Sequence, residues 1–98
     1  MTVYHLLRAE HEILEAVKFY DSRADGLAAD FFAQFKKARR DIIDFPELWG
    51  EIGGAYRRKL VDRYPYGIIY RIESEQIIVV ALVHTSRKPG YWIKDLDK

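Results

Sequence analysis

The sequence contains no cysteine, so disulfide bonds, thiolate nucleophiles and thiolate metal sites are excluded. Its three histidines, His5, His11 and His84, lack the H-x-x-x-H spacing of a metal site, and we expect neither a metal nor another cofactor. There is also no glycine-rich phosphate loop and no pair of carboxylates at the predicted strand ends. These absences argue against phosphate-loop proteins and two-carboxylate hydrolases.

Long hydrophobic runs are missing as well. The N-terminus has no apolar segment of signal-peptide length, and no stretch approaches the roughly 20 apolar residues that a membrane-spanning helix needs. We therefore expect a cytoplasmic protein that makes no contact with a membrane.

The chain has 98 residues, enough for one modest core, and we expect residues 1–98 to form a single domain. A hydrophobic content of 49% with 14% aromatic residues is typical of a folded globule. The net charge of +1 conceals an asymmetry, because residues 1–54 carry seven basic and ten acidic side chains whereas residues 55–94 carry eight and three. This division either indicates an anionic partner for the basic half or only reflects acidic residues placed on helices.

Two helices are predicted between residues 9 and 45 by apolar residues that recur every three or four positions. The apolar face of the first helix carries Ile13, Ala16, Val17 and Tyr20, and that of the second carries Leu27, Phe31, Phe35, Ala38, Ile42 and Phe45. Asp25 is predicted to cap the second helix, and Pro46 to end it, because the residue before a proline avoids helical backbone angles. The short connection predicts an antiparallel helical hairpin.

Strands are predicted on both sides of this hairpin. They span residues 2–7, 56–62, 66–73 and 76–85, and residues 46–55 are predicted to be a loop in which Trp49 packs onto the core. Ile77–Val83 is apolar at every position, which is typical of a central strand covered on both faces.

The expected fold is therefore a small α+β domain of order β-α-α-β-β-β. Its antiparallel meander, over residues 56–85, carries the hairpin on one face. Since the helices cover only that face, the C-terminal segment 86–98 or a partner is expected to cover part of the other.

A basic cluster, Arg57, Arg58, Lys59 and Arg63, lies on and just after the first strand of the meander. The two-residue period of a strand places Arg57 and Lys59 on one face and Arg58 on the other. Clustered guanidinium groups suit a phosphate backbone, because arginine binds phosphate through two parallel hydrogen bonds. The alternative is a solvated edge strand whose charges prevent aggregation.

A second candidate site follows the central strand, in the run His84-x-x-Arg87-Lys88-Pro89-x-Tyr91-Trp92. His84 could act as a general acid or base near neutral pH, and Arg87 could neutralise charge on a phosphate. Tyr91 and Trp92 could stack on bases. The alternative is a structural histidine at a strand end, with Tyr91 and Trp92 packed over the sheet.

The order of elements and three motifs together resemble the RelE/ParE superfamily of bacterial toxins over essentially the whole chain. The motifs are Arg58-Lys59-Leu60, Tyr64-Pro65-Tyr66-x-Ile68-x-Tyr70-Arg71 and Val80-x-x-Val83-His84-x-x-Arg87-x-Pro89-x-Tyr91-Trp92. The resemblance implies the growth-inhibiting toxin of a type II toxin–antitoxin system, of the kind linked to plasmid stabilization. It implies a cognate antitoxin that binds through a partly disordered segment, and contact with operator DNA only through that antitoxin.

Two activities divide that superfamily. RelE-like members cut messenger RNA on the ribosome, and for that branch the resemblance implies catalytic roles for Arg58, His84, Arg87 and Tyr91. ParE-like members poison DNA gyrase and lack much of the catalytic set. We favour the ParE-like branch, because the lysine-rich strand of the nucleases is reduced here to Lys59.

For either branch the residues expected to bind the target or nucleic acid are Arg57, Arg58, Lys59, Arg63, Arg87, Lys88 and Trp92. A protein-interaction domain without toxicity is a further alternative.

Overall fold

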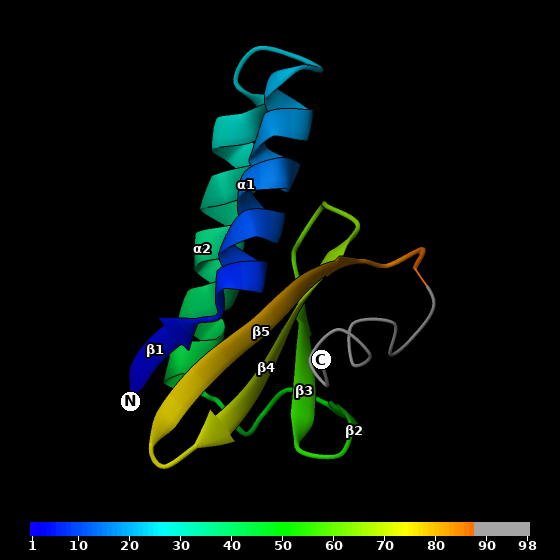
Figure 1. Cartoon of the computed structure of the whole chain (residues 1–98). Helices are drawn as coiled ribbons and strands as arrows, with labels where there is room; N and C mark the ends of the chain where they lie inside the picture. The colour runs from blue at the N-terminus through cyan, green and yellow to red at the C-terminus, as the bar shows by residue number, and fades with distance from the viewer. Residues whose placement is uncertain (88–98) are drawn as a thin grey trace.

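A computed structural model describes residues 1–87, which form two helices and one five-stranded sheet (Figure 1). The elements in chain order are β1 (Thr2–His5), α1 (Leu7–Asp21), α2 (Leu27–Asp44), β2 (Glu51–Gly53), β3 (Tyr56–Leu60), β4 (Tyr66–Glu73) and β5 (Gln76–His84). The strand order across the sheet is β1-β5-β4-β3-β2. All neighbouring strands are antiparallel except β1 and β5, which are parallel. The predicted α+β fold with a helical hairpin is confirmed.

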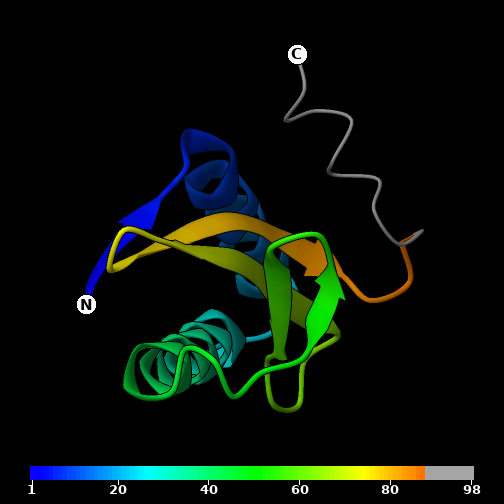
Figure 2. The same cartoon turned by 90° about the horizontal axis from the view of Figure 1, so that it is seen from below.

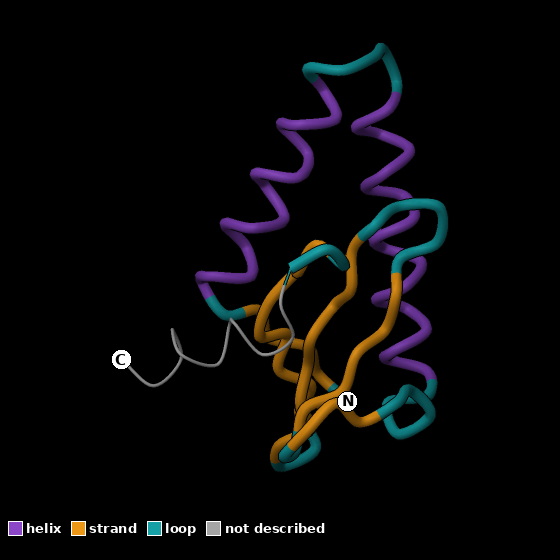
Figure 3. The backbone as a smooth tube through the Cα atoms, turned by 90° about the vertical axis from the view of Figure 1, so that its right-hand side faces the viewer, coloured by secondary structure: helices purple, strands orange, loops and turns teal. Residues whose placement is uncertain are grey.

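The hairpin of α1 and α2 packs on one face of the sheet, and its connecting loop extends beyond the end of the sheet (Figures 1 and 3). Most residues predicted for the apolar faces of the helices are buried: Ile13, Ala16 and Tyr20 in α1, and Phe31, Phe35, Ala38 and Ile42 in α2. Ala9 is buried as well, whereas Phe45, which follows α2, is 61% exposed. Neither helix in residues 1–87 combines the length and the apolar character that crossing a membrane requires.

The prediction that Asp25 caps α2 is wrong. Gly26 occupies the cap position with a φ of +80°, and no side chain caps the helix. The turn between the helices needs a left-handed residue at this point, and glycine adopts that conformation without steric cost. The predicted end of α2 is confirmed, since Phe45, just before Pro46, leaves the helical region with φ −140° and ψ 67°.

The sheet carries apolar side chains on both faces. On the helix-facing side, Ile68, Tyr70, Ile77, Val79 and Leu82 join the helices in the main core. On the outer side, a second buried cluster consists of Ile69, Ile78, Val80, Ala81 and Val83. The prediction that β5 is a central strand is confirmed, because it lies between β1 and β4 and every residue of Ile77–Val83 is buried.

Residues 46–55, predicted to be a loop, contain the short strand β2, which pairs with the start of β3 (Figure 2). The turn between these strands uses Gly53 and Gly54, both with positive φ. Three residues are too few to produce an alternating pattern, so β2 left no periodic signal in the sequence. Trp49 does pack against the main core, and its Nε1 donates a hydrogen bond to the Asp41 carbonyl at 3.2 Å.

Candidate functional site

His84, the last residue of β5, lies on the helix-facing side of the sheet because β5 contains a bulge. Ala81 pairs with Ile69, but Val79 already pairs with Tyr70, so Val80 has no partner on β4. Val80 and Ala81 consequently both lie in the outer cluster. The bulge thus reverses the alternation of the strand and turns Leu82 and His84 towards the helices.

The bulge is tied to α1 by a carboxylate. Oε1 of Glu12 accepts a hydrogen bond from the Leu82 backbone N–H at 3.1 Å, and Oε2 lies 3.5 Å from Nε of Arg8. A bulge interrupts the ladder of backbone hydrogen bonds, and this side chain supplies an acceptor for a backbone group just beyond the interruption. Glu12 therefore helps to hold the end of β5 in position.

His84 has a well-defined hydrogen-bonding state. Its Nδ1 accepts a hydrogen bond from the Ser86 backbone N–H at 3.1 Å, and Ser86 Oγ lies 2.7 Å from the same nitrogen. Because Nδ1 is an acceptor, the neutral ring carries its proton on Nε2. The ring packs against Tyr66 in an edge-on arrangement, with centroids 5.2 Å apart. These contacts fit the structural role considered for His84, and they leave Nε2–H as the donor for other contacts.

An open groove of about 270 Å³ lies between α1 and the end of β5. His84, Arg87, Tyr66 and Leu82 line it from the sheet, and His11, Glu12, Glu15, Ala16 and Phe19 line it from α1. His84 and Arg87, predicted to act together, are therefore brought to one groove. The α1 residues were not predicted to belong to a site, although the spacing of Glu12, Ala16 and Phe19 places them on one helix face.

Arg57, on the helix-facing side of β3, holds the segment that leads into β2. Its guanidinium donates to the carbonyl of Glu47 at 3.0 Å, to the carbonyl of Trp49 at 2.7 Å and to the carboxylate of Glu51 at 3.1 Å. Only 20% of the side chain is exposed. These internal contacts use the donors that would otherwise bind a phosphate.

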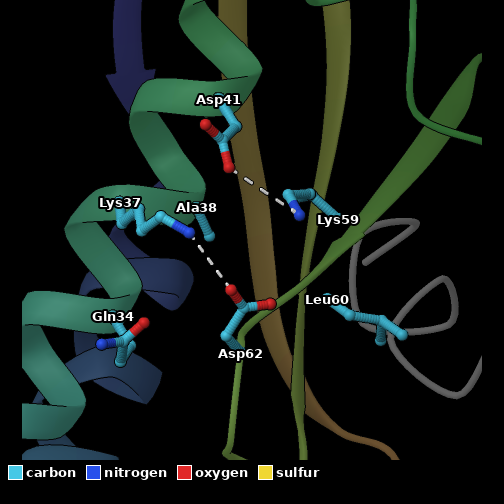
Figure 4. Close-up of a pocket in the computed structure, with 7 residues that line it drawn as sticks. All are labelled: Gln34, Lys37, Ala38, Asp41, Lys59, Leu60 and Asp62. Carbon is cyan, nitrogen blue, oxygen red and sulfur yellow. Dashed lines mark hydrogen bonds and ion pairs between the residues drawn. The ribbon is translucent and has the colours of Figure 1, made fainter.

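Lys59 lies on the same face and also points inwards (Figure 4). Its Nζ is 3.9 Å from Oδ2 of Asp41 on α2 and 4.2 Å from the centre of the Trp49 ring, and 14% of the side chain is exposed. Beside this pair, Lys37 of α2 bonds Asp62 at 3.2 Å. The ammonium group of Lys59 thus belongs to the packing between α2 and β3.

Arg58 lies on the outer face, where it pairs across the sheet with Ile69. Its stem crosses Gly67 so closely that a Cβ added there would lie 3.0 Å from Cδ of Arg58. The residue is exposed, and it makes no ion pair with any residue in the described part of the chain. Of the three cations on β3 itself, Arg58 is therefore the one that presents its charge to solvent.

Arg63 lies in the turn between β3 and β4 with a φ of 68°, and it contacts α2. Its guanidinium bonds Asp30 at 3.1 Å, and the Tyr64 hydroxyl donates to the same carboxylate at 2.5 Å. The hydrogen bond to Asp30 raises the pKa of Tyr64, because it stabilises the protonated phenol. The turn is thus fastened to the helical hairpin.

The structure therefore separates the predicted cationic cluster. Arg58 lies on the outer face, whereas Arg57 and Lys59 lie on the helix-facing side, as does the groove that His84 and Arg87 line. Lys88, Tyr91, Trp92 and most of the segment 86–98 lie outside the described residues. Within residues 1–87, no three His, Cys, Asp or Glu side chains are grouped closely enough to hold a metal ion.

The chain has the fold of a class of small α+β proteins. In this fold a helical hairpin packs on a mixed five-stranded sheet, in which β1 lies parallel to β5. One solved structure with this fold, "Chromosomal ParDE TA system from P. aeruginosa", superposes with a TM-score of 0.77. The alignment covers 88% of this chain and 97% of that chain at 10% sequence identity, so the likeness shows the shared fold.

The family is shown by a match to a family model over most of the sequence. The family model described as the ParE toxin of the type II toxin–antitoxin system, parDE, matches residues 6–89. The chain belongs to the ParE toxin family of type II toxin–antitoxin systems. A search of curated proteins gave no match.

Proposed function

We propose that this toxin inhibits bacterial growth by binding DNA gyrase and that it cleaves no RNA. The observation that carries the proposal is the position of Arg58 on the outer face, away from the groove of His84 and Arg87. A phosphoryl-transfer site needs cations that converge on one phosphate, with the acid and base within reach of it. The internal contacts of Arg57 and Lys59 support the same conclusion, because they reduce the charge available to a nucleic acid.

Family membership supplies the second partner. The toxin of a type II system has a cognate antitoxin, and we propose that an acidic segment of this antitoxin is attracted to the basic second half of the chain. We expect an antitoxin-like open reading frame beside the gene. Gyrase and the ribosome are both cytoplasmic, and we propose that the toxin acts there as a single domain.

A supercoiling assay with purified gyrase tests the proposed target. We expect the toxin to inhibit supercoiling and Arg58→Gln to weaken the inhibition about tenfold, as for a charged contact at an interface. Arg40→Gln is the matched control, because Arg40 is an exposed arginine on α2 outside both predicted clusters. Unchanged supercoiling at saturating toxin would contradict the proposed target.

Ribosome-dependent RNA cleavage is the second candidate, and one observation favours it: His84 and Arg87 line the same groove. In that case Arg87 would hold the phosphate and His84 would transfer a proton. Primer extension on translated messages after induction would then reveal cuts that disappear in the His84→Ala, Arg87→Ala double variant. We expect no cuts.

Induced expression in a bacterial host separates both toxin functions from a non-toxic interaction domain. We expect growth to stop and to resume when the cognate antitoxin is co-expressed. Normal growth with soluble product would favour the interaction domain.

A further inference from the structure

A second cavity, which we call the β1 pocket, lies between the end of β1 and the helical hairpin and has a volume of about 300 Å³. It is lined by His5 of β1, Glu10 and Ile13 of α1, and Phe32, Phe35, Lys36 and Arg39 of α2. This volume is at the lower end of the range for small-molecule sites. None of these residues belongs to the groove beside His84 or to the cationic cluster of β3.

Two residues that line the β1 pocket each have a buried nitrogen atom without a hydrogen bond to any residue in the described part of the chain. The two atoms are Nε2 of His5 and Nε of Arg39. Buried polar groups in folded proteins nearly always have a partner, so two such atoms on residues that line one cavity call for an acceptor. Nε of Arg39 is always a donor, and Nε2 of His5 is a donor in one neutral tautomer and in the imidazolium.

The remaining lining adds charge and an apolar surface. Lys36 holds its ammonium 5.1 Å from the centre of the Phe32 ring, which is stacked on Phe35 at 6.0 Å with an interplanar angle of 12°. Phe32 is 40% exposed, so one ring is open to a ligand. Two cations, Lys36 and Arg39, face one carboxylate, Glu10, which favours an anionic head group.

We propose that the β1 pocket binds a carboxylate carried on a small, flat apolar body. Nε of Arg39 and Nε2 of His5 are shielded from solvent in the ligand-free chain, so in the proposed complex both side chains turn towards the cavity and donate to the carboxylate. The apolar body packs on Phe32. Burial, reinforced by the nearby charge of Arg39, lowers the pKa of His5, so at neutral pH its ring donates one hydrogen bond as the neutral imidazole. The proposal is independent of the gyrase target.

Titration of the full-length toxin with 3-phenylpropionate, followed by amide NMR, tests the proposal. The matched neutral probe is 3-phenylpropionamide, which keeps the ring and loses the charge. We expect saturable shifts at His5, Phe32 and Arg39 with the acid, and an affinity at least about tenfold lower for the amide, since hydrogen bonds to charged groups are the stronger ones. Equal affinities, or shifts confined to other regions, would overturn the proposal.

Two variants of α2 distinguish binding in the β1 pocket from nonspecific attraction to the positive charge of the helix. Arg39→Gln should weaken binding of the acid about tenfold or more, whereas Arg40→Gln makes the same charge change at an exposed neighbour and should leave it unchanged. If Arg39→Gln does not fold, Phe32→Ala takes its place, because Phe32 is partly exposed and its removal takes away the apolar contact. Binding by either pocket variant that equals the parent's would also overturn the proposal.

A third arm identifies the source of the carboxylate. The peptide acetyl-Phe-Glu-Phe-amide competes with the free acid for the same pocket, and its Gln counterpart is the neutral control. Tighter binding of the Glu peptide supports an acidic side chain of a protein partner, and tighter binding of the free acid supports a small metabolite. Failure of both acids to bind would refute the carboxylate site while leaving the gyrase assay unaffected.

Discussion

Arg57 and Arg58 are adjacent in the sequence, yet one is held by internal hydrogen bonds and the other is exposed to solvent. The Arg57 side chain is only 20% exposed and bonds two carbonyls and a carboxylate, whereas Arg58 lies across Gly67 on the outer face with its charge in solvent. Successive side chains of a strand point to opposite faces of the sheet, so the adjacent basic residues of β3 are divided between its two faces. Charge that is contiguous in sequence therefore need not form one binding site.

The largest expected effect is a difference in stability between variants of Arg57 and Arg58. Arg57→Ala removes three hydrogen bonds that hold the segment from Glu47 to Glu51, and we expect the free energy of unfolding to fall by about 2–3 kcal/mol. The matched variant Arg58→Ala should change it by less than about 0.5 kcal/mol, as exposed residues usually do. Urea denaturation of both variants measures the difference, and equal losses would remove the distinction between the two faces.

A second test concerns the helix-facing side of the sheet, where Glu12 bonds the backbone of β5 beside its bulge. Glu12→Ala leaves the Leu82 backbone N–H without its carboxylate acceptor, and we expect a loss of about 2 kcal/mol in the free energy of unfolding. Hydrogen exchange should also speed up at the end of β5, because Glu12 ties the strand to α1 beyond the bulge. Glu15→Ala, at an exposed carboxylate on the same helix, is the control. Equal effects of the two variants would contradict the anchoring role of Glu12.

Tyr70 lies beside Arg57 on the helix-facing side of the sheet and also bonds the chain between α2 and β2. Its hydroxyl donates to the Pro46 carbonyl at 2.6 Å, so Tyr70→Phe should lower the free energy of unfolding by about 1 kcal/mol at pH 7.

Burial also raises the pKa of Tyr70 to about 12, although the Arg57 charge opposes the shift. The unfolded chain loses this proton first as the pH rises above 10, and stability should decline between pH 10 and 12. Chemical denaturation across that range should give a shallower decline for Tyr70→Phe. Identical pH profiles would contradict the shift.

The smallest expected effect is a pH dependence of stability caused by His5, the last residue of the edge strand β1. Burial, followed by the Arg39 charge, lowers its pKa, while Glu10 on α1 opposes the shift. The unfolded chain therefore binds a proton first as the pH falls through 6.5, so stability should decrease from pH 7.5 towards pH 5. His5→Gln should reduce that slope in thermal unfolding measured without ligand. A slope equal to that of the parent would show that His5 is not responsible.

Most of the fold could be predicted because its long elements carry strong periodic signals. Tyr66–Glu73 was predicted to the residue, and the apolar spacing of α1 and α2 identified their buried faces. The parallel pairing of β1 with β5 could not be predicted, because it depends on residues more than 70 positions apart. The bulge at Val80 was equally hidden, since Ile77–Val83 is apolar throughout and shows no alternation that a bulge could interrupt.

Less of the candidate site followed from the sequence. The two-residue period correctly separated Arg58 from Arg57 and Lys59, but it could not say which of them would meet internal acceptors. Those acceptors are backbone carbonyls of Glu47 and Trp49, which every sequence possesses and whose direction only the folded loop defines. The β1 pocket was missed as well, because its lining comes from β1, α1 and α2, and only the folded chain brings these elements together.

The pairing of β1 with β5 has a consequence for biosynthesis. Thr2 pairs with Gln76 and His5 with Val79, so β1 is synthesised about 70 residues before β5, its partner in the sheet. Contacts between distant residues close slowly, and here the sheet cannot be completed until translation has passed β5. A growing polypeptide that has not yet passed β5 therefore lacks the strand with which β1 pairs, and the five-stranded sheet forms only after β5 has been made.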